Sequence, residues 1–170
     1  MKGFSSCVVL SRNDTNFRVY FGDYPTKEQI SIMTKRNINI IVNLCTKSEI
    51  SIKPKIVVPS GLELIDIPII DGTSNKSQMV DSNALMLLVR RIERMVNKDP
   101  TAIYIFDVGC GRSAMFTAIL IGKLTSNDSE TMIKIVEGAY MSRSDLKPKW
   151  KFARAFHNTK QKEIVKSWLS

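Results

Sequence analysis

The chain has 170 residues, 44% of them hydrophobic, with a formal net charge of +9, three cysteines and one histidine. This length and composition suit a single domain over residues 1–170 with a buried core, and exclude a disulfide framework or a zinc site. The sequence shows no apolar run of roughly 18 residues, no signal peptide and no prenylation motif, so we expect an intracellular, soluble protein, cytoplasmic or nuclear, without cofactor or metal.

The first half of the chain predicts a hairpin, a helix and two further strands. Short stretches that alternate apolar and polar residues predict the hairpin strands, and Asn13 with Asp14 offers the turn. Thr26 can cap a helix whose inner face carries Ile30 and Met33. β-branched and apolar runs then predict two more strands. In order, the predicted strands span residues 7–10, 17–21, 38–44 and 62–67.

The second half of the chain is dominated by helical patterns. Apolar residues recur at helical spacing in four segments, and one short apolar run between them predicts a central strand. The strand is predicted over 102–106 and the helices over 77–97, 112–124, 129–140 and 149–168. Strands that alternate with helices predict the α/β fold class, with a central mixed or parallel sheet flanked by helices.

A glycine-rich turn between the predicted central strand and the next helix is the most informative segment. It contains Gly109 and Gly111, and the helix begins at Arg112. Such a turn directs several backbone N–H groups at one point, close to the positive end of a helix dipole. An arginine there can bind two oxygens of a phosphate. Taken alone, the pattern fits an anion site and a strand–helix connection that binds nothing equally well.

In its context the turn resembles the signature loop of the protein tyrosine and dual-specificity phosphatases, His-Cys-x-x-Gly-x-Gly-Arg-Ser. Two positions depart from that pattern, because Ile105 replaces the histidine and Phe106 replaces the cysteine. The resemblance implies a cysteine-phosphatase-like fold over about residues 8–140. The phosphate-loop remnant that it implies consists of Asp107, Val108, Gly109, Cys110, Gly111 and Arg112, followed by Ser113.

A second stretch, residues 65–74, looks like the mobile general-acid loop of the same family, with Asp71 at the acid position. The resemblance is nearest to the phosphatase of regenerating liver subgroup, which shares Pro68, the segment 78–81 and a strand that ends at Cys45. In that subgroup a cysteine such as Cys45 can form a regulatory disulfide with the nucleophile. With phenylalanine at the nucleophile position, we expect that switch to be lost.

The family's chemistry requires a thiolate, and phenylalanine has neither a lone pair nor an ionisable proton. Phe106 therefore predicts a pseudophosphatase, a protein that is not an enzyme. Because this position faces the centre of the loop and burial of the ring is favourable by about 1.5–3 kcal/mol, we expect the ring to fill the anion site. The side chain at the position of Asp107 usually points outward in the family. No cysteine of the chain has an arginine six residues after it.

Two of the retained residues, Asp71 and Arg112, each have two interpretations. Asp71 is either a remnant general acid or a turn aspartate before Gly72. Arg112 either binds an anion or pairs with a carboxylate and holds the turn together. Ser113 is expected to support the start of the helix.

A basic helical segment is expected from about residue 143 to the end of the chain. Residues 143–166 contain eight basic and two acidic residues, so this span supplies +6 of the net charge. The candidate interaction surface consists of Lys147, Lys149, Trp150, Lys151 and Arg154. Basic and aromatic side chains together suit single-stranded nucleic acid or an anionic surface, but also an amphipathic helix with its lysines in water.

Three functions follow from the sequence. The first is a catalytically dead dual-specificity-phosphatase-like scaffold or structural module that binds a protein partner or self-associates. The second is a phospho-ligand reader that uses Arg112 without hydrolysis, and the third a nucleic-acid-binding protein that uses the basic C-terminal segment. The Ile-, Lys- and Asn-rich composition hints at an AT-rich genome, of viral or parasitic origin.

Overall fold

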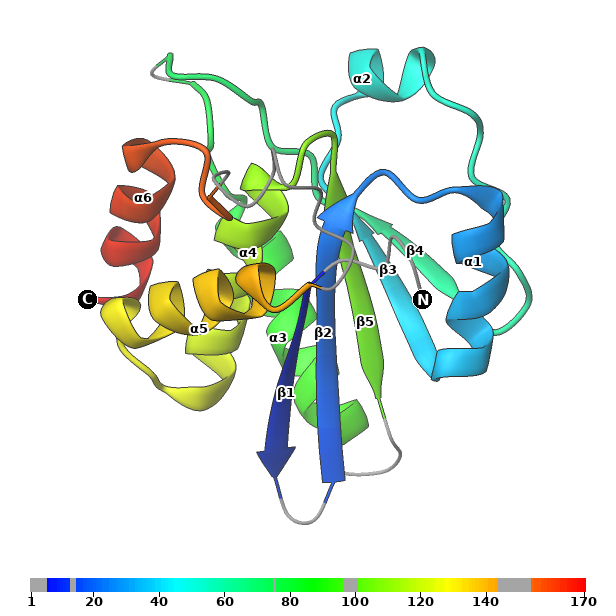
Figure 1. The fold of residues 1–170 in the computed structure, drawn as a ribbon, viewed down its shortest axis with the longest axis horizontal. Helices are drawn as coiled ribbons and strands as arrows, with labels where there is room; N and C mark the ends of the chain where they lie inside the picture. Colours follow the sequence, from blue (N-terminus) through cyan, green and yellow to red (C-terminus); the bar gives the residue numbers. More distant parts are fainter. Residues whose placement is uncertain (1–5, 13–14, 75, 97–100, 144–153) are drawn as a thin grey trace.

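A five-stranded mixed sheet forms the centre of the computed structural model, which describes residues 6–12, 15–74, 76–96, 101–143 and 154–170 (Figure 1). The strand order is β1-β2-β5-β3-β4. β1 (Ser6–Arg12) pairs antiparallel with β2 (Thr15–Asp23), and the other neighbours run parallel. The parallel strands beyond β2 are β3 (Ile38–Asn43), β4 (Glu63–Asp66) and β5 (Ala102–Asp107). The predicted α/β class is confirmed.

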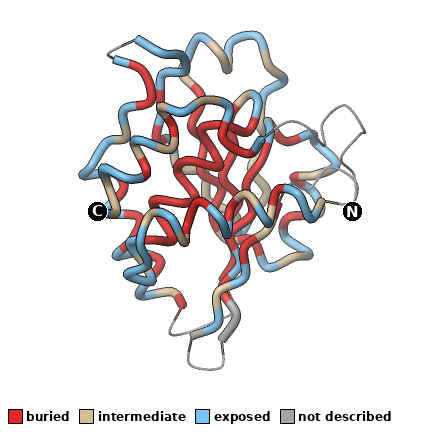
Figure 2. Tube along the Cα trace, turned by 60° about the vertical axis from the view of Figure 1, so that its left-hand side comes forward, coloured by how far each residue is buried: buried red, intermediate tan, exposed pale blue. Residues whose placement is uncertain are grey.

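Helices cover both faces of this sheet and enclose two hydrophobic cores. The helices are α1 (Lys27–Met33), α2 (Lys47–Ser51), α3 (Ser82–Val96), α4 (Gly111–Thr125), α5 (Ser129–Met141) and α6 (Thr159–Leu169), with a 3₁₀ turn η1 (Thr34–Arg36). The larger core joins the sheet to α3, α4, α5 and α6, and the smaller one joins the opposite face to α1. Buried backbone runs through the middle of the molecule in Figure 2.

The sheet's central strand, β5, and the helix that follows it are the most deeply buried elements. Every residue of β5 is buried, and so is α4 from Gly111 to Gly122. The connection between them therefore lies at the carboxyl end of the central strand, between the two cores. In parallel α/β sheets this edge is where ligand-binding loops are found.

Several element boundaries differ from those predicted. The capping box of Thr26 confirms the predicted start of α1. α3 begins at Ser82, and not at residue 77, because Gln78 has a positive φ of 61° and Asp81 then accepts a hydrogen bond from the amide of Ala84. α6 begins at 159, after the cap residue Asn158, and the preceding residues 154–158 are not helical. The proposed turn at residues 13–14 lies outside the described part of the chain. Within that part, no helix is both long and apolar enough to cross a membrane.

Candidate functional site

The loop from β5 to α4 turns sharply through two residues with positive φ. Gly109 has φ 116° and Cys110, the N-cap residue of α4, has φ 82°. A non-glycine residue in this region is uncommon and costs free energy. Hydrogen bonds compensate at Cys110, whose amide donates to the Asp107 carboxylate and whose carbonyl accepts from the Ser113 hydroxyl. The loop is thus held in one conformation by its own side chains.

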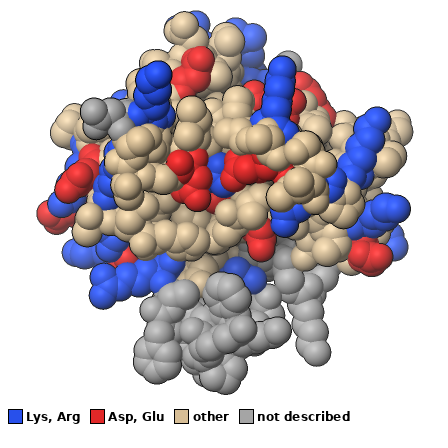
Figure 3. All heavy atoms as spheres, turned by 90° about the horizontal axis from the view of Figure 1, so that it is seen from above, with Lys and Arg blue, Asp and Glu red and all other residues tan. Residues whose placement is uncertain are grey.

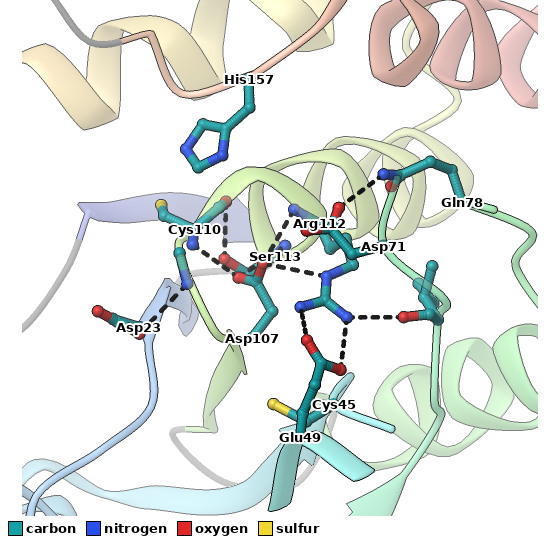
Figure 4. A network of polar contacts seen from close by, with 12 residues as sticks. Asp23, Cys45, Glu49, Asp71, Gln78, Asp107, Cys110, Arg112, Ser113 and His157 are labelled. Carbon is teal, nitrogen blue, oxygen red and sulfur yellow. Dashed lines mark hydrogen bonds and ion pairs between the residues drawn. The ribbon is translucent and has the colours of Figure 1, made fainter. Parts of the chain in front are cut away.

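The Asp107 carboxylate lies at the focus of the loop's N–H groups (Figure 4). Its Oδ1 accepts from the amides of Cys110 at 2.9 Å and Ser113 at 3.3 Å. Its Oδ2 accepts from the amide of Arg112 at 3.2 Å and from the Arg112 Nε at 3.3 Å. The side chain is buried, which corrects the expectation that it points outward. The chain's own carboxylate therefore holds the donors that an anion would use.

The electrostatics of Asp107 combine opposing effects. Burial raises the pKa of its carboxyl group above the usual range, and the Arg112 guanidinium and the hydrogen bonds from Ser113 and Arg112 offset only part of that rise. Each oxygen accepts two N–H donors, so neither has a position left for a proton of its own. The hydrogen-bond geometry is that of the ionised carboxylate.

The side chain of Arg112 is fully buried and forms an ion-pair network. Its Nη1 donates to Glu49 at 2.9 Å and to the Ile69 carbonyl at 2.7 Å, and its Nη2 donates to the other oxygen of Glu49 at 2.6 Å. With the Nε on Asp107, two carboxylates share the guanidinium. Of the two interpretations of Arg112, the contacts match the one in which it pairs with carboxylates and holds the loop.

Glu49 reaches Arg112 from α2, a helix of five residues that we did not predict. The side chain of Thr46 accepts from the Glu49 amide while Glu49 accepts from the Thr46 amide, a reciprocal capping box. Burial acts to raise the pKa of Glu49, but hydrogen bonds from Arg112 and Thr46 outweigh it and hold the pKa below its usual range. The pattern Thr-x-x-Glu at 46–49 was the signal that could have located this helix and its glutamate.

The ring of Phe106 does not occupy the centre of the loop, which corrects our expectation. It is fully buried in the smaller core, with its centroid 5.3 Å from that of Tyr24 in an edge-on contact and 6.0 Å from that of Tyr104. Ile105 faces the larger core on the other side of the sheet. Alternation along β5 explains this, because residues two apart share a face, as Tyr104 and Phe106 do. The group among the loop amides is the next side chain, Asp107.

Two other sequence-identified residues have local roles near the loop. Asp71 is exposed, and its Oδ1 accepts from the Gly72 amide and from the Gln78 side chain, as expected of a turn aspartate. The Ser113 hydroxyl donates to the carbonyls of Gly22 and Cys110, and so supports the start of α4 as expected. Asp23, which the sequence did not single out, accepts from the amide of Gly109.

The N-terminal end of α6 packs over the loop and ties it to the segment around Asp71. A Cβ atom on Gly111 would lie 2.8 Å from the Gln161 side chain and 2.9 Å from that of His157. Gln161 accepts from the His157 amide and donates to Gln78, and Lys160 donates to carbonyls at 73 and 74. Any larger residue at 111 would therefore force His157 or the Gln161 side chain to move.

The remaining candidate residues do not join this site. Arg154 is exposed, and Lys147, Lys149, Trp150 and Lys151 lie outside the described residues. All three cysteines are free thiols. Burial raises the pKa of Cys45 and of Cys110 to about 12 each. Among the residues that the structure describes, no group of three or more His, Cys, Asp or Glu side chains could hold a metal ion.

The face that carries the loop is acidic at its middle. Figure 3 views this face from above, and shows Asp and Glu side chains near its centre while Lys and Arg stand mostly around its edge. Glu49 and Asp71 belong to the segments on either side of the loop (Figure 4). Despite the net charge of +9, a free anion that approaches the loop meets carboxylates first.

Comparisons with known proteins identify the fold. No protein-family model matches the sequence, and no curated protein matches it significantly. Kinase associated phosphatase, in a form with its catalytic-site cysteine changed to serine, has a TM-score of 0.66 at 19% identity, with 97% of this chain and 93% of that chain covered. A putative protein tyrosine phosphatase from Leishmania major has a TM-score of 0.60 at 11% identity, with 96% and 98% covered. The PTP-2 phosphatase of Cydia pomonella has a TM-score of 0.58 at 18% identity, with 88% and 84% covered.

These similarities define the class of architecture: the chain has the fold of the tyrosine and dual-specificity phosphatases over nearly its whole length. The β5–α4 loop lies where the sequence resemblance places the phosphate loop, between the central strand and the most buried helix. The nearer resemblance to the phosphatase of regenerating liver subgroup remains a prediction.

Proposed function

We propose that the chain is a catalytically inactive phosphatase-fold domain that acts by binding another protein, as a scaffold or structural module. The observation that carries this proposal is the side chain at the end of β5, where the sequence resemblance requires a nucleophile. Phe106 stands there, its ring packed against Tyr24 and Tyr104. A phenyl ring cannot attack phosphorus, and removal of the nucleophile generally abolishes covalent catalysis.

No cysteine in the chain offers a substitute for that nucleophile. A reactive cysteine needs a lowered thiol pKa and access to solvent. Burial raises the pKa of Cys45 and Cys110 to about 12 and also raises that of Cys7. At Cys110 the nearby negative charge of Asp107 adds to the effect of burial and raises the thiol pKa further, which disfavours the thiolate. The environments of the three cysteines therefore support the proposal that the chain has no cysteine nucleophile.

Exposed apolar side chains beside the loop support a role in protein binding. Ile52 is 82% exposed directly after α2, and Ile70 is 51% and Met79 66% exposed on the segment before α3. α2 and the segment before α3 lie at the same end of the molecule as the loop (Figure 1). Exposed apolar side chains that form a patch are typical of protein interfaces.

Hydrolysis of a generic aryl phosphate tests the loss of catalysis. We expect no turnover by the purified chain above the level of a Phe106→Ala control. Turnover that the wild type shows and the control lacks would refute the proposal, because it would assign a catalytic step to this loop.

Cross-linking to co-purifying proteins tests the binding role. We expect a protein captured by the wild-type chain to be lost when Ile52 and Met79 are both changed to serine. The matched control is Met86→Ser, a less exposed methionine on α3 at 37%. Capture that the double variant retains would remove this surface from the proposal.

The two alternative functions have less support. A phospho-ligand reader needs an available guanidinium, whereas Arg112 is fully buried against Glu49 and Asp107. A nucleic-acid interface would use the basic C-terminal segment, of whose candidate residues only Arg154 belongs to the described part of the chain. Neither alternative has an observation of its own in its favour.

A further inference from the structure

We propose that the Asp107 carboxylate acts as an internal ligand, which fills the oxyanion position of the β5–α4 loop and keeps small external oxyanions out. This inference concerns the same loop as the proposed function but does not depend on it, because the loop can be self-occupied whether or not the chain binds a partner. The blocking group is thus a carboxylate of the loop itself, and not the phenyl ring of its neighbour.

The donors around Asp107 form a preorganised anion site. Three backbone amides, those of Cys110, Arg112 and Ser113, converge on one carboxylate, and the Arg112 Nε completes the set. The amides are fixed by the loop and by the first turn of α4, where the helix dipole also favours negative charge. Removal of the carboxylate would leave all four donors buried and unsatisfied. Such a set has a strong preference for any small anion that can reach it.

Glu49 does not compete for this position. It takes the outer nitrogens of the guanidinium, Nη1 and Nη2, whereas Asp107 takes the Nε. With the Asp107 carboxylate removed, Glu49 still holds Arg112 in place and the Nε still points into the loop. The vacated position is the size of the deleted group, so formate fits it, and the larger phosphate ion serves as a probe of the space.

If Asp107 is only a structural cap, the expected result differs from that for an internal ligand. A cap stabilises the loop, and its loss is not repaired by added solutes. A ligand can be exchanged, so a free anion of the same chemistry restores what the deletion removes. Chemical rescue therefore separates the two interpretations.

The test is thermal unfolding of Asp107→Ala titrated with sodium formate, and separately with inorganic phosphate, at an ionic strength kept constant with sodium chloride. We expect the variant to melt below the wild type, and formate to raise its Tm saturably. The wild type should respond to neither salt, because its loop is occupied. Asp71→Ala is the matched control, since it deletes a neighbouring carboxylate but leaves the loop amides engaged, and formate should not raise its Tm. A variant that folds but shows no saturable response to formate or phosphate would overturn the proposal.

A second measurement uses the wild-type chain and does not depend on the folding of a variant. The amide NMR signals of Cys110, Arg112 and Ser113 should remain unshifted as formate or phosphate is added. A saturable shift at these amides would show that external anions enter beside Asp107, and would overturn the proposal.

If Asp107→Ala folds only when formate is present, the proposal is supported. Neither readout involves hydrolysis or partner capture, so failure of this inference is distinguishable from failure of the proposed function.

Discussion

Phe106 and Asp107 are consecutive residues at the end of β5, yet they serve different parts of the molecule. Phe106 extends the smaller core, and Asp107 binds the loop amides. The sequence pattern located the loop and the altered position, because glycine spacing and the following arginine are visible in the sequence. Which of two adjacent side chains enters the loop depends on strand alternation and rotamer, and the pattern does not encode these.

Truncation of Phe106 should destabilise the chain without creating an anion site. Phe106→Ala deletes a fully buried ring in contact with Tyr24 and Tyr104, so we expect a loss of about 3–5 kcal/mol in the free energy of unfolding. Urea denaturation measures it, and Val108→Ala, at a half-buried position of the same loop, should cost much less. A loss below about 1 kcal/mol would mean that the ring does not pack as the structure shows.

Restoring a cysteine at position 106 should not restore phosphatase activity. In Phe106→Cys the new thiol would take the fully buried position of the ring in the smaller core, and both burial and the negative charge of the adjacent residue Asp107 raise a thiol pKa. We expect no aryl phosphate hydrolysis, and slow alkylation by iodoacetamide at neutral pH. Alkylation should be faster when Asp107→Ala is added, since the same charge is then absent. Equal alkylation rates in the single and double variants would contradict a role for Asp107 in the electrostatics of this position.

Stability should fall in acid partly through Glu49. Its folded-state pKa is lowered from the usual 4.5, so its contribution is present above that pH and is lost as the pH falls through the folded value. Glu49→Gln removes a charged partner of the buried Arg112, and we expect a cost of about 1.5–3 kcal/mol at pH 7. Urea unfolding of both chains from neutral pH downward should show this difference shrinking below about pH 4.5. A constant difference would mean that the carboxylate charge contributes nothing.

At the scale of elements, the predictions failed where one side chain decides a boundary. The strands and the central helices follow hydrophobic periodicity and were located to within a few residues. α2 is too short for periodicity, and only the capping pair Thr46 and Glu49 marks it. The start of α3 depends on the backbone at Gln78, and the start of α6 on Asn158 as its cap. Such local hydrogen bonds override the helical pattern that surrounds them.

The N-terminal end of α6 should restrain the segment before α3. Gln161 is buried and joins His157 to Gln78, so Gln161→Ala breaks a bridge between α6 and residues 70–78. We expect faster hydrogen exchange at the amides of Ser77 and Gln78, which donate to carbonyls of this segment. Glu163→Ala, an exposed change on the same helix, is the control and should leave these amides unchanged. Equal exchange in both variants would show that α6 does not hold this segment.

At the scale of the whole molecule, the fold was predictable and the electrostatic character of the face that carries the loop was not. Alternating strands and helices, with a glycine-rich turn after the central strand, specified the architecture. Net charge is a sum over the sequence, and it suggested a face attractive to anions. In the folded chain the parallel strands bring carboxylates from separate segments to one edge, so that Glu49 and Asp107 meet at Arg112.

The basic character of the chain should therefore produce only weak, salt-sensitive binding to nucleic acid. Part of the positive charge is already engaged, since Lys162 pairs with Glu137 and Lys160 donates to backbone carbonyls. We expect a fluorescent single-stranded oligonucleotide to bind at low salt without sequence preference, and to dissociate near about 0.15 M salt, where the Debye length is about 8 Å. Arg154→Ala, at an exposed position, should lower the salt dependence by no more than about one phosphate contact. Tight binding that persists at about 0.15 M salt would instead require a built interface, with aromatic stacking in addition to charge, and would favour nucleic acid over a protein as the partner.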